Sequence, residues 1–361
     1  MSASDTDAGS STRREIFQQP DLWPTTIERV LAAISGLETR ISGGRILFTG
    51  AGTSAYAASA AAGASPRAFA VPTTDLLLDA ERHLAGVSTV ISLARSGQSP
   101  ESAAVVDTVK RLRRDIFQLA VTCNPDSALI RAPIDQAIIL DPRANDHSLV
   151  MTSSFSNLVL AGHCLLTPEA AAAAAKQISG QARDLLLVID QACKSAADHV
   201  RDRLVVLSSS PMQGWAQEAR LKALEMTAGA FAVMAETFLG LRHGPMSFVR
   251  QDTPVLALLS SDPLRRLYEV DLLRELRAKK IGILMGIAGP DAPAGLFDLT
   301  IPAAAPQLTD ALRTPYEIMA PQLLGYHLSL ATGLDPDNPS PGGVINRVVQ
   351  GVFIHASQGD A

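Results

Sequence analysis

The stretch 87–115, "VSTVISLARSGQSPESAAVVDTVKRLRRD", decides the fold class. An apolar run is followed by a loop rich in serine and then by a helical pattern that ends in basic residues. Residues 253–281, "TPVLALLSSDPLRRLYEVDLLRELRAKKI", repeat this order, again with a proline near the helix start. The apolar runs lack strict alternation, which indicates strands buried on both faces of a parallel sheet. We therefore expect an α/β protein with two related subdomains, each a doubly wound, flavodoxin-like sheet flanked by helices.

The same signals extend along most of the chain. Strands are expected at about 45–50, 87–93, 117–122, 135–140, 203–210, 231–237, 254–260, 281–288 and 297–301. Helices are expected at about 24–40, 53–63, 99–114, 153–166, 168–197, 212–229, 263–280 and 308–332. The predicted organisation is a disordered N-terminus (1–12), a first subdomain with its leading and bridging helices (13–197), a second subdomain (198–335), and a tail that closes over the site (336–361).

Composition and charge exclude several classes of protein. Hydrophobic residues make up 47% of the chain and charged residues 19%, with a formal net charge of −5. The basic cluster at 110–114 falls at a predicted helix end, so we expect no nucleic-acid partner. Three widely spaced cysteines indicate neither a disulfide framework nor a zinc site. Without an apolar signal region or about 18 consecutive apolar residues, the chain is expected to be cytoplasmic, with no membrane partner, metal or cofactor.

Two loops at strand-to-helix junctions are suited to binding a phosphate. Pro100 and Glu101 mark a helix start with Ser99 as its N-cap, so the preceding loop lies where unpaired backbone N–H groups attract an anion. The loop in "GAGTSA" at 50–55 has the same position after an earlier strand. Neither loop is a Walker motif or a good dinucleotide fingerprint. Serine and glycine also populate ordinary loops, but two such loops on adjacent strands favour a phosphate site formed by Gly52, Thr53, Ser54, Arg95, Ser96, Gly97 and Ser99.

The helix predicted at 212–229 carries a narrow charged stripe. Glu218, Lys222 and Glu225 lie at i, i+4 and i+7, within about 60° of one another on the helix. An exposed helix with stabilising charge pairs would have the same spacing. Large apolar residues border the stripe on both sides, however, and this favours a cleft in which a carboxylate beside an ammonium moves protons.

Two further groups are candidates for contact with a substrate. His243, in "GLRHGPMSF", lies in a loop fixed by a Gly-Pro turn, although a single histidine is more often structural. Thr152, Ser153 and Ser154, in "MTSSF", could contact sugar hydroxyls, and they would serve equally well as helix caps.

The motifs "GAGTSA", "SLARSGQSPES", "MTSSFSNLVLAG", "EARLKALEMTAG", "RHGP" and "LDPDNPSPGGVINRVVQG" together resemble the sugar isomerase (SIS) superfamily. Within it the chain, over roughly residues 25–355, is most similar to the tagatose-6-phosphate ketose/aldose isomerases, also described as galactosamine-6-phosphate deaminases. The resemblance implies conversion of D-galactosamine 6-phosphate to tagatose 6-phosphate and ammonia. Alternatives are a ketose/aldose phosphate isomerase that releases no ammonia, a deaminase specific for glucosamine 6-phosphate, and a phosphosugar-sensing module.

The isomerase domain of glucosamine-6-phosphate synthase is also similar, and it implies individual roles. Ser54, Ser96 and Ser99 would bind the phosphate, and Glu225, beside Lys222, would move a proton between C1 and C2. His243 would open the sugar ring and be lent by the neighbouring subunit, which implies a homodimer. Glu218 and Arg347 are further candidates for substrate contact. Where the synthase has Ser-Gln, this chain has Ala94-Arg95, and it has no glutaminase domain, so deamination is the more natural direction.

Overall fold

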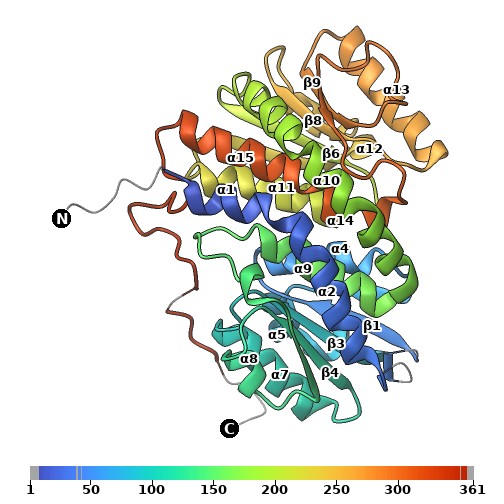
Figure 1. The fold of residues 1–361 in the computed structure, drawn as a ribbon, viewed down its shortest axis with the longest axis vertical. Helices are drawn as coiled ribbons and strands as arrows, with labels where there is room; N and C mark the ends of the chain where they lie inside the picture. Colours follow the sequence, from blue (N-terminus) through green and yellow to red (C-terminus); the bar gives the residue numbers. More distant parts are fainter. Residues whose placement is uncertain (1–7, 38–39, 42, 350, 356–361) are drawn as a thin grey trace.

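The computed structural model describes residues 8–37, 40–41, 43–349 and 351–355, and it contains two five-stranded parallel sheets. Figure 1 shows the sheets at opposite ends of the molecule with a layer of helices between them. The first sheet has the order β2 (Ala68–Ala70), β1 (Arg45–Thr49), β3 (Val87–Ala94), β4 (Phe117–Thr122), β5 (Gln136–Ile139). The second has the order β10 (Leu299–Pro302), β9 (Ile283–Ala288), β8 (Pro254–Leu258), β6 (Arg203–Ser208), β7 (Ala232–Thr237).

The two sheets share one topology. When the strands of each sheet are numbered along the chain from its own first strand, both follow the order 2-1-3-4-5. This confirms the predicted flavodoxin-like, doubly wound fold. In the first sheet Thr49 pairs with Ser92, and Ser92 pairs with Ala120. The carboxyl ends of β1 and β3 therefore lie side by side, and the two serine-containing loops leave the sheet at the same edge.

The helices between the sheets form the main hydrophobic core. α4, α9, α2, α10, α11 and α15 contact one another across the boundary between the subdomains, and Trp23 and Trp215 are fully buried there. Trp23 also packs edge-on against Tyr316 with ring centroids 4.8 Å apart. The helices are α1 (Ser10–Phe17), α2 (Gln19–Ile34), α4 (Thr53–Ala62), α5 (Thr73–Leu78), α6 (Ala80–His83), α7 (Pro100–Leu112), α8 (Ala128–Arg131), α9 (Ser153–Leu166), α10 (Pro168–Ala197), α11 (Gln213–Met226), α12 (Phe238–Leu241), α13 (Pro263–Ala278), α14 (Asp310–Glu317) and α15 (Met319–Ala331), with 3-10 turns at Pro142–Ala144 and Pro245–Phe248.

The N-terminal region differs from its prediction. Residues 10–12, assigned to a disordered segment, form the first turn of α1, while residues 1–7 lie outside the described part of the chain. Thr12 is fully buried because the carboxylate of Asp337 accepts hydrogen bonds from its amide and hydroxyl. The helix predicted at 24–40 begins at Gln19 and ends at Ile34. Pro20, in its first turn, was the better start signal than Pro24.

Smaller differences concern short elements and one long helix. The helix predicted at 308–332 is two helices, because α14 ends at Glu317 and α15 begins at Met319. A proline lies in the second turn of α14 and another in the first turn of α15, where each removes a backbone donor. The three-residue strand β2 and the short helices α5, α6, α8 and α12 were not predicted, because they are too short to show a period. Among the described residues, no helix combines the length and hydropathy required to cross a bilayer.

Gly214 allows α11 of the second subdomain to approach α4 of the first. A Cβ atom at Gly214 would lie 2.5 Å from the amide nitrogen of Ala60 and 2.6 Å from the carbonyl oxygen of Tyr56. Both neighbours are backbone atoms that cannot rotate away. We expect Gly214→Ala to lower the free energy of unfolding by about 1–3 kcal/mol, as overpacked cores do.

Urea denaturation of the wild type and of the Gly214→Ala variant measures this cost. Gly180→Ala, also within a helix, is the matched control because a Cβ there meets no atom within 4 Å. That control should gain about 0.5–1 kcal/mol from the better helix propensity of alanine. A Gly214→Ala variant as stable as Gly180→Ala would mean that the helices can separate without cost.

Candidate active site

A cavity of about 150 Å³ lies at the carboxyl edge of the first sheet. Gly97 shapes it, because its φ of +58° favours glycine and a Cβ there would lie 2.7 Å from the Cβ of Ser127. Of the predicted phosphate-binding residues, all but Thr53 line this cavity. Its lining includes Gly52, Ser54, Arg95, Ser96, Gly97 and Ser99, together with Met151 and residues 347–349 of the tail.

The serine hydroxyls of this cavity differ in what they contact. The Ser54 hydroxyl makes a 3.9 Å contact with the sulfur of Met151, and the Ser96 oxygen accepts a long 3.4 Å bond from the amide of Gln98. Ser99 stands at the N-cap position of α7, as predicted, but its hydroxyl donates to Glu101 instead of capping the helix. Ser54 and Ser96, at the amino ends of α4 and α7, therefore keep the most donor capacity for an anion.

Arg95 lies behind the cavity and holds its walls together. It is 5% exposed, and its guanidinium donates to the carbonyls of Leu149, at 3.2 Å, and of Arg347. Its buried Nε has no hydrogen-bond partner among the described residues. Burial and then the charge of Arg347 lower the pKa of Arg95, yet a guanidinium remains a cation at neutral pH. Arg347 in turn donates to the carbonyl of Asp146 at 3.0 Å.

The side chains of Thr152, Ser153 and Ser154 neither cap α9 nor line the serine cavity. All three are fully buried. The carboxylate of Asp146 accepts the amides of all three residues at 2.9 Å and also the hydroxyls of Thr152 and Ser154. The Ser153 hydroxyl donates to the carbonyl of Glu15 at 2.6 Å. Asp146 therefore caps α9, and the three side chains line neither the serine cavity nor the cavity that Glu225 reaches.

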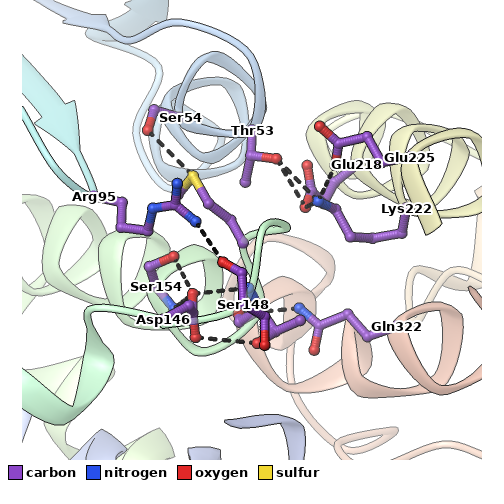
Figure 2. A network of polar contacts seen from close by, with 12 residues as sticks. Thr53, Ser54, Arg95, Asp146, Ser148, Ser154, Glu218, Lys222, Glu225 and Gln322 are labelled. Atoms are coloured by element: carbon purple, nitrogen blue, oxygen red, sulfur yellow. Dashed lines mark hydrogen bonds and ion pairs between the residues drawn. The ribbon is translucent and has the colours of Figure 1, made fainter. Parts of the chain in front are cut away.

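The charged stripe of α11 is buried where α11 meets α4. The Lys222 ammonium lies 2.5 Å from a carboxylate oxygen of Glu225 and 3.4 Å from one of Glu218. Thr53, the first residue of α4, contacts both Lys222 and Glu218 at 3.3 Å. Figure 2 shows Ser54 and Arg95 on one side of Thr53 and the three charged groups on the other. Thr53 thus connects the serine cavity with the stripe instead of facing a phosphate.

One ammonium is shared by two carboxylates, and this sets their protonation. Lys222 and Glu218 are fully buried, and Oε2 of Glu218 has no hydrogen-bond partner among the described residues. Burial therefore raises the pKa of Glu218 to about 8, although Lys222 opposes the shift. Burial favours the neutral amine of Lys222, but the charges of Glu218 and Glu225 outweigh it and raise its pKa. At neutral pH the group consists of a protonated Glu218 and a Lys222–Glu225 ion pair.

Glu225 reaches a second cavity, of about 480 Å³. Its side chain is 25% exposed, whereas those of Glu218 and Lys222 are not exposed at all. The other walls are mainly apolar and come from α11 and from the tail, and they include Leu221, Leu224, Leu334, Val344 and Ile345. Of the three charged groups of the stripe, Glu225 is thus the one that a substrate can contact directly.

His243 is not part of this arrangement within a single chain. It is exposed in the loop between α12 and the 3-10 turn Pro245–Phe248, and its amide donates to the carbonyl of Gly240 at 3.0 Å. No hydrogen bond or ion pair within the described residues joins its imidazole to Glu225 or to the serine loops.

Two residues of the site were missed by sequence reasoning. Asp146 is fully buried and caps α9, but it lies six residues before Thr152, too far for the usual N-cap pattern. Glu15, on α1, accepts the amides of His147 and Ser148. Burial and then the charge of Asp146 raise the pKa of Glu15 to about 7. No local signal marks Glu15, because its partners are more than 130 residues away.

Comparisons with known proteins agree on one group of relatives, although no family model matches the chain. D-galactosamine-6-phosphate deaminase AgaS of Shewanella sp. (strain ANA-3) is 34% identical, covering 95% of this chain and 91% of that protein. The Escherichia coli protein of the same name is 32% identical, covering 97% of each. The solved structure of tagatose-6-phosphate ketose/aldose isomerase from Escherichia coli has a TM-score of 0.85 at 29% identity, covering 97% of this chain and 98% of that one. Glucosamine-6-phosphate deaminase from Thermotoga maritima shares the fold, with a TM-score of 0.75 at 22% identity over 94% of this chain and 99% of that one.

The raised pKa of Glu218 predicts a pH-dependent stability. Between pH 4.5 and about 8 the folded protein holds a proton on Glu218 that the unfolded chain releases, so this residue destabilises the fold as pH rises. Glu218→Gln removes the titration. We expect the stability of E218Q relative to the wild type to increase from pH 5 to pH 8, by at most about 1.4 kcal/mol per pH unit.

Denaturation curves at several pH values between 5 and 8 measure the difference. Glu28→Gln, at an exposed position of α2, is the control and should show a difference from the wild type that does not change with pH. An E218Q difference that is equally flat would mean that Glu218 is ionised in the folded protein.

Proposed function

The chain belongs to the family of D-galactosamine-6-phosphate deaminases and tagatose-6-phosphate ketose/aldose isomerases, which are SIS-type phosphosugar isomerases, and on this premise we propose that it converts D-galactosamine 6-phosphate to tagatose 6-phosphate and ammonia. One structural observation supports the proposal independently of the relatives' names. Thr53 contacts Glu218 and Lys222 while its chain neighbours Gly52 and Ser54 line the serine cavity, so the proposed anion site and proton-transfer group share one helix start.

The serine cavity would bind the 6-phosphate. Ser54 and Ser96 supply hydroxyl donors, and the first turns of α4 and α7 supply unpaired amides that attract a dianion. Arg95 and Arg347 add positive charge from behind without filling the space. The sugar would then extend from this anchor past Thr53 toward Glu225.

Glu225 would move the proton in the reaction. In the open-chain sugar its carboxylate removes the proton from C2, the electron pair forms the C1=C2 bond of an enolamine, and the C1 carbonyl pair moves to O1, which takes a proton from solvent. Return of the C2 proton from Glu225 to C1, as the nitrogen lone pair forms the C2=N bond, gives an iminium. Attack by water at C2 expels ammonia, returns one proton to solvent and leaves the ketose. The Lys222 ammonium, 2.5 Å away, orients the carboxylate.

Ammonia release separates this proposal from its alternatives. The protein should release ammonia from galactosamine 6-phosphate, and faster than from glucosamine 6-phosphate, as a coupled ammonia assay would measure. Glu225→Gln should lower this rate by about 10²–10⁴-fold, which is the usual contribution of a positioned acid–base group. Binding of the sugar phosphate, followed by calorimetry, should remain because Glu225 does not line the serine cavity.

Glu169→Gln is the control, because Glu169 is exposed at the start of α10, and it should keep the wild-type rate. Conversion of hexose phosphates without ammonia release would favour the plain isomerase, and a preference for glucosamine 6-phosphate would favour the other deaminase. Binding of these sugars with no turnover would favour a phosphosugar-sensing module. An E225Q variant with near-native turnover would remove Glu225 from the proposed role.

The complete site would be shared between two subunits. His243 is exposed, and no hydrogen bond or ion pair among the described residues connects it to Glu225, yet its Gly-Pro-fixed loop suits a functional role. The family resemblance implies that this histidine opens the sugar ring. We therefore propose a homodimer in which the partner's His243 completes the site around Glu225. The three buried free thiols of Cys123, Cys164 and Cys193 suit a reducing compartment, and we propose a cytoplasmic location.

Mixing two inactive variants tests the shared site. Glu225→Gln and His243→Ala should each abolish turnover when alone. In a mixed dimer one site carries both changes and the other carries neither, so random exchange at equal amounts should restore about a quarter of the wild-type activity.

Subunit exchange, followed by size-exclusion chromatography and the same ammonia assay, measures the recovery. A mixture that stays inactive after verified exchange would mean that His243 and Glu225 act within the same chain. Mixing E225Q with itself is the control and should recover nothing.

A further inference from the structure

The second sheet has a loop of the same construction as the phosphate-site loop of the first. β3 and β8 occupy equivalent places in the two sheets, and each is followed by a serine at the second residue after the strand, Ser96 or Ser260. Each loop then enters a long helix, α7 or α13, with a proline in its first turn. Ligands of such sheets bind at this edge, so the fold offers two equivalent positions for an anion.

In the second subdomain a carboxylate of the protein itself fills this position. Asp310 accepts the amide of Ser261 at 2.7 Å, the hydroxyl of Ser260 at 2.5 Å and the hydroxyl of Ser261 at 3.0 Å. Arg265 donates to the same carboxylate at 3.2 Å. Asp310 is 4% exposed. An amide, two hydroxyls and a guanidinium around a buried oxyanion are the donors that would hold a phosphate.

A second carboxylate occupies the adjacent part of this edge. Glu269, on α13, accepts the Ser209 hydroxyl at 2.5 Å and the Ser260 amide at 2.7 Å, and so joins the loops after β6 and β8. In the first subdomain Ser96, after β3, and Ser54, in the first turn of the helix that follows β1, line a cavity instead. The carboxyl edge of the second sheet is therefore occupied by carboxylates of the protein, whereas that of the first sheet borders a cavity.

Asp310 is held in place by the rest of its helix. Further along α14, Arg313 donates to the carbonyl of Leu259 at 2.8 Å, and Glu317 accepts the amides of Ala304 and Ala305. α14 also packs against α9 and α4 of the first subdomain. The helix that delivers the carboxylate is thus bound to both subdomains.

We infer that the second subdomain contains an anion cradle built like the phosphate cavity of the first, and that Asp310 is its built-in ligand. The cradle is specific for an oxyanion and would take inorganic phosphate or sulfate when the carboxylate is removed. The second position accordingly serves to anchor α14, whereas the cavity of the first subdomain stays open. This inference concerns the second sheet and does not rest on the proposed enzymatic function.

Replacing Asp310 by alanine should create a phosphate site. The test uses the full chain in a Ser54→Ala/Ser96→Ala background, which weakens the open site of the first subdomain. In that background Asp310→Ala should lower the melting temperature, and added inorganic phosphate at constant ionic strength should restore it in a saturable manner. The same additions to the background protein alone should have little effect, and chloride should not replace phosphate or sulfate.

Two variants control for a general loss of stability. Asp310→Asn keeps the cradle filled by an uncharged side chain, so it should be destabilised without the response to phosphate. Asp262→Ala removes the cap on the Arg265 amide, at 2.9 Å, but leaves Asp310 in place, and it should behave likewise. If the alanine variant unfolds, its recovery on refolding should require phosphate. An Asp310→Ala protein that responds to phosphate no more than Asp310→Asn, or that fails to refold in phosphate, would overturn the inference.

Discussion

The site depends on one buried ammonium, that of Lys222, at the boundary between the subdomains. A lone buried charge would cost several kcal/mol, so its position is tolerable only with Glu225 as its ion-pair partner and with the oxygens of Glu218 and Thr53 beside it. Glu225 supplies the closer contact and Glu218 the longer one, while Thr53 supplies an oxygen from the other subdomain. The interface must therefore be tight, and Gly214 allows it by bringing α11 against the backbone of α4.

The two subdomains share a topology, but different groups occupy the carboxyl edges of their sheets. At the edge of the first sheet, Gly97 adopts a left-handed conformation and the serines face a cavity. At the edge of the second, Asp310 and Glu269 satisfy the donors that an exposed loop would leave open. A parallel sheet flanked by helices presents unpaired amides at this edge, which water, a ligand or the protein itself can satisfy. In the second sheet the protein's own carboxylates do so, whereas the first sheet leaves a cavity that a ligand could enter.

Much of the fold was predictable because its signals are local. The apolar runs, serine loops and helix starts lie within a few residues of one another. The charged stripe of α11 follows from the 3.6-residue period of a helix. The roles of Arg95, Thr12 and the caps of α9 were not predictable. Arg95 contacts residue 347, and Thr12 contacts residue 337, separations of 252 and 325 residues. Thr152, Ser153 and Ser154 suited a cap or a ligand equally in the sequence. In the structure, the Asp146 carboxylate accepts their amides and provides the cap.

These distant contacts connect the two cavities mechanically. The tail lines the serine cavity with residues 347–349 and the Glu225 cavity with residues 340–345. Figure 1 shows the tail running down one side of the molecule from α15 toward the first sheet. Asp337, near the start of the tail, accepts a hydrogen bond from α1. Arg95 donates to the carbonyl of residue 347, and Glu15, on α1, accepts the amide of His147 in the neighbouring loop. Because one short segment forms a wall of each cavity, a displacement of the tail at the serine cavity must also change the surroundings of Glu225.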